Sequence, residues 1–188
     1  MTIMSDAFIA IAPIGPLPAA WIEPLKDRIQ EIFGYPTREV ALLDDVEFAR
    51  DPERDQYHST CILEALAAKA PPGAVKVLGI TEVDLFIPIL TYVFGEAQLG
   101  GVACIVSTCR LNAAGMAGNA QGVFRERMVK EAIHELGHTF KLRHCQEKAC
   151  IMHYCRSTQD VDCKTNALCR YCRVLVEDER KRLAKRET

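Results

Sequence analysis

Apolar runs bounded by turn residues predict a set of short strands along the chain. Mostly apolar runs of six or seven residues are typical of strands that are buried in a sheet. We predict strands at Phe8–Pro13, Arg38–Leu43, Val75–Ile80 and Val102–Thr108. The longer apolar run Asp84–Gly95 contains Pro and Gly, so we expect it to form shorter extended pieces.

Helical periodicity predicts four helices. Apolar residues spaced three and four apart mark one face of a helix, and Gly or Pro marks its end. The predicted helices cover Ala19–Phe33, Ser59–Ala70, Phe124–Phe140 and Ala167–Arg186. The polar segment Asp44–Tyr57 is expected to be a loop, and the glycine-rich segment Asn112–Gly122 a mobile one.

This order of elements predicts an α/β or α+β fold in which helices are layered on a sheet. The character of the chain changes after residue 141, because residues 142–172 hold few core aliphatics and six of the nine cysteines. Such a segment cannot close a hydrophobic core of its own and needs another means of holding its shape. We therefore expect one compact domain over residues 1–188, with a sheet-and-helix part (1–141) and a cysteine-rich part (142–188).

The composition argues against several classes of partner. The net charge is −2, so we expect no basic surface for nucleic acid or for an anionic membrane. The run Asp84–Phe94 is too short to cross a bilayer, and the first residues lack the basic region of a signal peptide. We expect a cytoplasmic monomer whose cysteines are reduced, with neither nucleic acid nor a membrane as partner.

The motif His134-Glu135-Leu136-Gly137-His138 carries the chemistry. Side chains four residues apart share one face of a helix, so His134 and His138 can reach the same metal ion. Zinc lowers the pKa of a bound water to about 7 and polarises a carbonyl group. Glu135 can then accept the proton of the water and deliver it to the leaving amine. The motif predicts a zinc-dependent peptidase, although HExxH also occurs by chance on helices that bind no metal.

His144 is the expected third ligand. It follows His138 by six residues, a spacing that resembles the extended metzincin signature HExxHxxGxxH. The glycine of that signature is Lys141 here, and a left-handed Lys would cost about 1–2 kcal/mol, which the metal bond could offset.

The segment Ile151-Met152-His153-Tyr154 resembles the Met-turn of metzincins. By this resemblance Met152 forms an apolar floor beneath the zinc ligands. Tyr154 would stabilise the tetrahedral intermediate, as the tyrosine of astacin-type enzymes does. The alternative is that Met152 is ordinary core filler and Tyr154 an ordinary packed phenol.

The pairs Cys145-x4-Cys150 and Cys169-x2-Cys172 have the spacing of a four-thiolate structural zinc site. Cys145, Cys150 and Cys155 follow one another at equal intervals, so spacing alone leaves open whether Cys155 takes part. Because His144 and Cys145 are neighbours, the thiolate site would also fix the backbone that aims the third imidazole.

Taken together, Glu131–Cys172 resembles the archaemetzincins, whose pattern is HExxHxxGxxxCxxxxCxM followed by a linker and CxxC. Here the pattern reads HELGHTFKLRHCQEKACIM and then CRYC. Two departures are Lys141 in place of glycine and a linker between Met152 and Cys169 that is one residue shorter.

This resemblance implies a compact metzincin-like fold in which a mixed twisted sheet carries a backing helix and an active-site helix. It implies two zinc ions, a catalytic one at the three histidines and a structural one at the quartet that includes Cys145 and Cys150. It also implies aminopeptidase-like or limited endopeptidase activity on peptide or protein substrates. In metzincins an edge strand above the cleft pairs with the substrate, and here Tyr92–Leu99 is the candidate.

Two other classes of function compete with the peptidase. A non-catalytic zinc module that has kept the fold would have no use for the carboxylate of Glu135. A thiol redox protein centred on Cys169-Arg170-Tyr171-Cys172 would need a CxxC pair that binds no metal.

Overall fold

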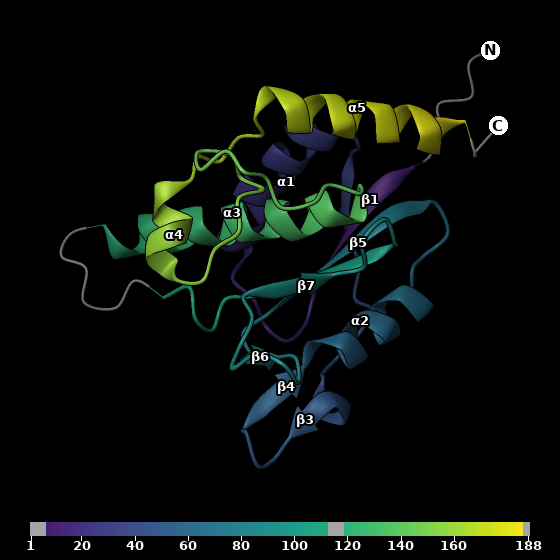
Figure 1. Ribbon diagram of the computed structural model, residues 1–188. Coiled ribbons are helices and arrows are strands. Elements are labelled where there is room, and N and C mark those ends of the chain that lie inside the picture. The colour runs from purple at the N-terminus through teal and green to yellow at the C-terminus, as the bar shows by residue number, and fades with distance from the viewer. Residues whose placement is uncertain (1–6, 113–118, 186–188) are drawn as a thin grey trace.

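The computed structural model describes residues 7–112 and 119–185, and a five-stranded mixed sheet forms its centre (Figure 1). The strand order is β2-β1-β5-β8-β7, and all neighbours are parallel except β7, which pairs antiparallel with β8 at one edge. The bounds are β1 Phe8–Pro13, β2 Thr37–Glu39, β5 Ala74–Thr81, β7 Gly95–Ala97 and β8 Ala103–Ser107.

Helices cover both faces of this sheet (Figure 1). The helices α1, α3 and α5 pack on one face and α2 packs on the other. Their bounds are α1 Ala19–Phe33, α2 Ser59–Ala68, α3 Ala120–Thr139 and α5 Arg170–Ala184, and the short α4 spans Thr158–Cys163. A second, three-stranded sheet is formed by β3 Arg50–Asp51, β4 Gln56–His58 and β6 Leu85–Phe86, next to the 3-10 helix η1 Glu47–Ala49.

Burial on both faces explains why the central strands are continuously apolar. Successive side chains of a strand point to opposite faces. In β1, Ile9 and Ile11 join the core beneath α1 and α3, whereas Phe8 and Ala10 join the core beneath α2. The mixed α/β class predicted from the sequence is confirmed.

Several predicted elements are confirmed and others need correction. The strand Phe8–Pro13 and the helix Ala19–Phe33 have the predicted bounds, and Gly34 ends α1 in a left-handed conformation with φ of 71°. The predicted strand Arg38–Leu43 is wrong beyond Glu39, where β2 ends. The last hydrogen bond between β2 and β1 runs from the Val40 N–H to the carbonyl oxygen of Ile11, and the chain then leaves the sheet so that Leu43 packs into the core beneath α2.

The predicted loops differ more from the structure. Asp44–Tyr57 contains η1, β3 and most of β4. The predicted mobile loop Asn112–Gly122 falls partly on residues 113–118, which lie outside the described residues, and α3 already begins at Ala120. Within residues 7–112 and 119–185, no helix is both long and apolar enough to cross a membrane.

Candidate active site and metal centres

The three predicted histidine ligands lie together at the C-terminal end of α3. His134 and His138 project from adjacent turns of the helix, and His144 returns from the loop that follows. The ring centroids of His134 and His138 are 4.7 Å apart, and that of His144 is 5.3 and 4.9 Å from them, respectively. One ligand atom from each ring lies within 4.8 Å of the others, which is close enough for all three to bind one ion.

Backbone carbonyl groups orient the two helical imidazoles. Nδ1 of His134 lies 2.9 Å from the carbonyl oxygen of Ile151, and Nδ1 of His138 lies 2.7 Å from that of Leu142. Because a carbonyl oxygen only accepts, each Nδ1 carries the hydrogen and leaves Nε2 with its lone pair free. The two Nε2 atoms are 3.2 Å apart and point to the same place, as expected for ligands of one metal ion.

The electrostatic surroundings keep these rings neutral. Burial lowers the pKa of all three imidazoles, and the buried ammonium group of Lys164 lowers the pKa values further. A neutral imidazole is the form that binds a metal ion, so the donor set fits zinc.

Lys141 adopts the turn that returns His144 to the site. Its φ is 66°, the left-handed conformation predicted at this position. Two contacts hold it there, because its Nζ lies 2.9 Å from Glu179 on α5 and its stem packs against Gly100. Part of the conformational cost of about 1–2 kcal/mol is therefore met by protein contacts alone.

Met152 and Tyr154 lie below and beside the triad. Met152 is fully buried, and a Cβ on Gly137 would lie 2.5 Å from its sulfur, so the glycine between the two helical ligands makes room for this side chain. Tyr154 is half exposed, lines the cavity described below, and its ring centroid is 4.9 Å from that of His144.

Glu135 is buried between α3 and the edge strand β7. A Cβ built on Gly95 of β7 would lie 2.6 Å from Cγ of Glu135, so only glycine leaves room for this carboxylate. Burial raises the pKa of Glu135 well above its ordinary value, and the negative charge of the nearby Glu131 adds a smaller increase. Sequence reasoning missed Gly95, because nothing in its local pattern indicates a contact with a residue 40 positions away.

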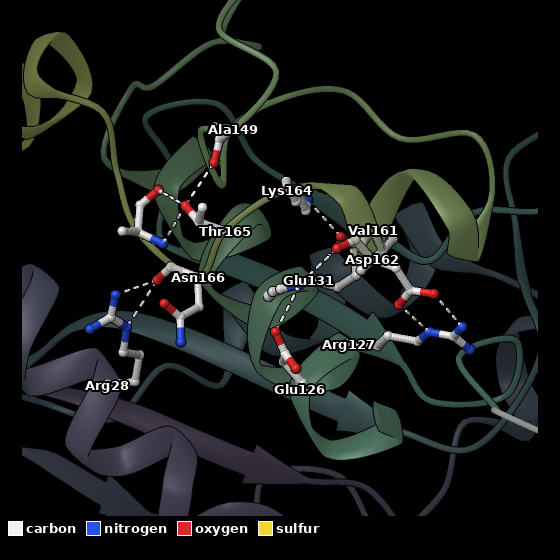
Figure 2. Close-up of polar contacts among 12 residues, drawn as sticks. Arg28, Glu126, Arg127, Glu131, Ala149, Val161, Asp162, Lys164, Thr165 and Asn166 are labelled. Atoms are coloured by element: carbon white, nitrogen blue, oxygen red, sulfur yellow. Dashed lines mark hydrogen bonds and ion pairs between the residues drawn. The ribbon is translucent and has the colours of Figure 1, made fainter. Parts of the chain in front are cut away.

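A buried ion pair lies one helical turn before the histidines. Nζ of Lys164, which is fully buried, is 2.7 Å from Oε1 of Glu131, and Figure 2 shows this pair joining the linker after α4 to α3. The contact is an ion pair rather than a directed hydrogen bond. Next to it, Arg127 forms a bidentate pair with Asp162 of α4 at 2.6 and 2.7 Å (Figure 2). Sequence reasoning missed these pairs as well.

The predicted cysteine quartet forms a second cluster. The sulfur atoms of its members lie within 4.8 Å of one another, and these members are Cys145, Cys150, Cys169 and Cys172. The backbone N–H of Cys169 donates to Sγ of Cys150, and that of Cys172 donates to Sγ of Cys169, each with a nitrogen–sulfur distance of 3.4 Å. Such N–H donors are expected around thiolate ligands. Four thiols in this arrangement fit a tetrahedral zinc ion.

Cys155 and Cys163 lie outside the quartet. Cys155 lines the cavity beside the histidines, and burial raises its pKa to about 11. Cys163 is exposed at the end of α4. The spacing left Cys155 as an alternative ligand, and the structure places it elsewhere.

Backbone contacts join the quartet to the histidine site. The Cys145 N–H donates to the carbonyl oxygen of Met152 at 2.9 Å, and Nδ1 of His153 lies 2.9 Å from the carbonyl oxygen of Cys145. The segment that carries His144 and Cys145 is therefore fixed against the Met152 turn.

A cavity of about 900 Å³ opens beside the histidines. The edge strand β7 and the segment before it form one wall, and α3 with the segment after Met152 forms the other. A sheet edge above three convergent imidazoles and a buried carboxylate is the arrangement of a zinc metallopeptidase.

Comparisons with known proteins identify the family. The model described as peptidase family M54 matches residues 72–178. The chain is 41% identical to the archaemetzincin of Archaeoglobus fulgidus over 76% of this chain and 79% of that protein. It is 37% identical to that of Methanocaldococcus jannaschii over 90% and 93% of the two chains. The chain belongs to peptidase family M54, the archaemetzincins, and is a zinc metallopeptidase.

Solved structures agree with this assignment. The crystal structure of the Archaeoglobus fulgidus archaemetzincin complexed with malonate superimposes with a TM-score of 0.75 at 35% identity, covering 89% of this chain and 98% of that one. The archaemetzincin of Methanopyrus kandleri gives a TM-score of 0.81 at 29% identity, covering 96% and 99%. The predicted metzincin-like fold is thus confirmed at the level of this family.

Proposed function

We propose that His134, His138 and His144 hold a catalytic zinc ion and that Glu135 moves the proton during peptide hydrolysis. The observation that carries this proposal is the convergence of three neutral imidazoles on one point beside a buried carboxylate. Zinc bound there supplies an acidified water and polarises the scissile carbonyl.

Glu135 is suited to proton transfer by its surroundings. Its raised pKa brings the carboxylate closer to the working pH, where a group can both accept and return a proton. Its contact with Gly95 holds the carboxylate at the wall where an extended substrate would lie. In this role an oxygen of Glu135 takes a proton from water and passes it to the leaving nitrogen.

Tyr154 has a supporting role in this proposal. Its side chain lines the cavity on the His144 side and is exposed enough to meet a substrate. The phenol donates a hydrogen bond to the oxygen that becomes negative during attack on the carbonyl.

The cysteine quartet holds a second, structural zinc ion in this proposal. The segment around it contributes few aliphatic side chains, so cross-linking by four thiolates supplies rigidity that its own core cannot. The predicted stoichiometry is two zinc ions per chain.

A matched pair of variants tests the proposal. Glu135→Gln should lower kcat by roughly 10²–10⁴-fold while elemental analysis still finds two zinc ions. Glu126→Gln is the control, because Glu126 is an exposed glutamate on the same helix, and within the described part of the chain its ion pair is with Lys130. A zinc-loaded wild type that cleaves no member of a peptide library would instead favour the catalytically silent zinc module, and full activity of Glu135→Gln would exclude the proposed proton transfer.

A further inference from the structure

A hydrogen bond spans the cavity beside the histidines. The Tyr92 hydroxyl donates to the backbone carbonyl of Arg156 at 3.0 Å, and both residues line the cavity. Tyr92 belongs to the segment before β7, and Arg156 to the segment after the Met152 turn. This contact, called here the cross-cleft bridge, therefore joins the two walls.

Side-chain packing braces the bridge. The Tyr92 ring meets Phe94 edge-on with centroids 5.5 Å apart, and the guanidinium carbon of Arg110 lies 4.2 Å from the Tyr92 centroid. Arg110 is itself paired with Asp84 at 2.6 Å. The bridge is thus a supported part of the wall.

The bridge lies close to the place where cleavage would occur. Gly95 contacts Glu135 and so marks the position of the proton-transfer group on the edge strand. Tyr92 precedes Gly95 by three residues, which in extended chain span at most roughly 10 Å. A substrate that runs along β7 toward Tyr92 therefore meets the bridge about three residues beyond the cleaved bond.

Strand direction indicates which end of the substrate arrives there. An extended peptide that pairs antiparallel with β7, the slightly more stable arrangement, runs from the Leu99 end of the strand toward Gly95. Its C-terminal residues then point at the bridge. At the other end of the cavity, the exposed Leu99 and Arg143 line the path for the N-terminal side of the substrate.

Charge at the bridged end agrees with this direction. The exposed guanidinium group of Arg156 lies over the Tyr154 ring, 5.8 Å from its centroid. Glu131 also lines the cavity, but its pairing with the buried Lys164 makes that pair neutral overall. The bridged end therefore carries a cation that suits a carboxylate and repels an ammonium group.

We propose that this peptidase cuts within about the last three residues of its substrate and binds the free α-carboxylate through Arg156, which differs from the aminopeptidase-like or limited endopeptidase activity implied by the resemblance. The inference rests on the proposed function and adds its substrate class, peptides with a free C-terminus. In each cycle one water is consumed, the peptide C–N bond breaks, the hydroxyl joins the acyl carbon and the proton joins the released amine.

A binding measurement tests the carboxylate site without turnover. Zinc-loaded Glu135→Gln protein is titrated in a calorimeter with acetyl-Leu-Leu as the free acid and as the C-terminal amide. We expect the acid to bind about 10-fold more tightly, and Arg156→Gln to abolish the preference. Arg143→Gln, at the opposite end, should retain it. Equal affinities for acid and amide in the Glu135→Gln protein would overturn the assignment.

A cleavage measurement tests the bridge. Wild-type enzyme and an N-acetylated decapeptide should yield C-terminal products of one to three residues by mass spectrometry. Tyr92→Ala should lengthen these products, and Tyr92→Phe should do so partly, because it loses only the hydrogen bond. Tyr57→Ala is the control, since its hydroxyl bonds to Glu47 away from the cavity. Cleavage far from the C-terminus by the wild type would refute the proposal. An acid preference without any cleavage would refute the peptidase mechanism but leave the carboxylate site supported.

Discussion

Removing the charge of Lys164 should destabilise the protein strongly, because it would leave the Glu131 carboxylate buried without its partner. The Lys164 side chain is fully buried, that of Glu131 is 4% exposed, and their charged atoms are 2.7 Å apart. Breaking a buried ion pair from one side costs about 3–5 kcal/mol. Lys164→Met, which keeps most of the side-chain volume, should lower the free energy of unfolding by this amount.

The double variant tests the cause of this loss. Replacing both partners with apolar residues removes the uncompensated charge. The free energy of unfolding of the double variant Lys164→Met/Glu131→Leu should therefore lie within about 1 kcal/mol of the wild-type value. Lys181→Met is the exposed control. Its pair with Glu177 leaves both side chains 63% exposed, so the substitution should cost less than about 0.5 kcal/mol.

Urea unfolding at fixed, saturating zinc measures these differences, because bound metal adds to the apparent stability. The single tryptophan, Trp21 on α1, is a suitable probe, since its ring packs against Phe124 of α3 with centroids 4.8 Å apart. A loss below 1 kcal/mol for Lys164→Met, or a double variant no more stable than the single one, would show that the pair does not hold the linker to α3 as described.

Three further predictions concern other parts of the molecule. Cys150→Ser should lower the zinc affinity of both the histidine site and the quartet, as measured by chelator competition. The control Cys163→Ser, at the exposed end of α4, should change neither affinity. Gly95→Ala should lower kcat at least about 10-fold with zinc retained, since the added Cβ would displace Glu135, and unchanged turnover would contradict that contact. The hydrogen bond from Arg127 holds the pKa of Asp162 below its ordinary value. The stabilisation by this pair is therefore complete above about pH 4 and declines as the pH falls further, so the stability difference between wild type and Asp162→Asn should shrink in acid unfolding experiments.

Local signals made much of the fold predictable. The strand β1 and the helix α1 have the expected bounds, because each is set by neighbouring residues: a buried apolar run in one case, and a helical period closed by Gly34 in the other. The metal-binding candidates were also found from the sequence, since ligand chemistry imposes fixed spacing within a helix or a tight turn. The helix α4 was missed although Ser157 and Asp160 form a capping box that a search for this motif would have found.

Long-range contacts account for most of what sequence reasoning missed. The contact between Gly95 and Glu135 joins a strand to a helix, and Lys164 meets Glu131 across 33 positions of the chain. No local pattern encodes such pairs. The division into two parts at residue 141 stays a prediction, although apolar side chains from both sides of that boundary share one core.

The open edge of β7 has a consequence for the solubility of this protein. A free sheet edge above a cleft can recruit a substrate, but it can equally recruit a strand from another copy of the chain and start aggregation. Here the exposed ladder is only three residues long, from Gly95 to Ala97. Three residues before Gly95, Tyr92 is hydrogen-bonded to the carbonyl oxygen of Arg156 on the opposite wall. If Tyr92 limits how far a peptide enters, as proposed above, the same hydrogen bond to Arg156 would also hinder pairing of this edge with a second copy of the chain.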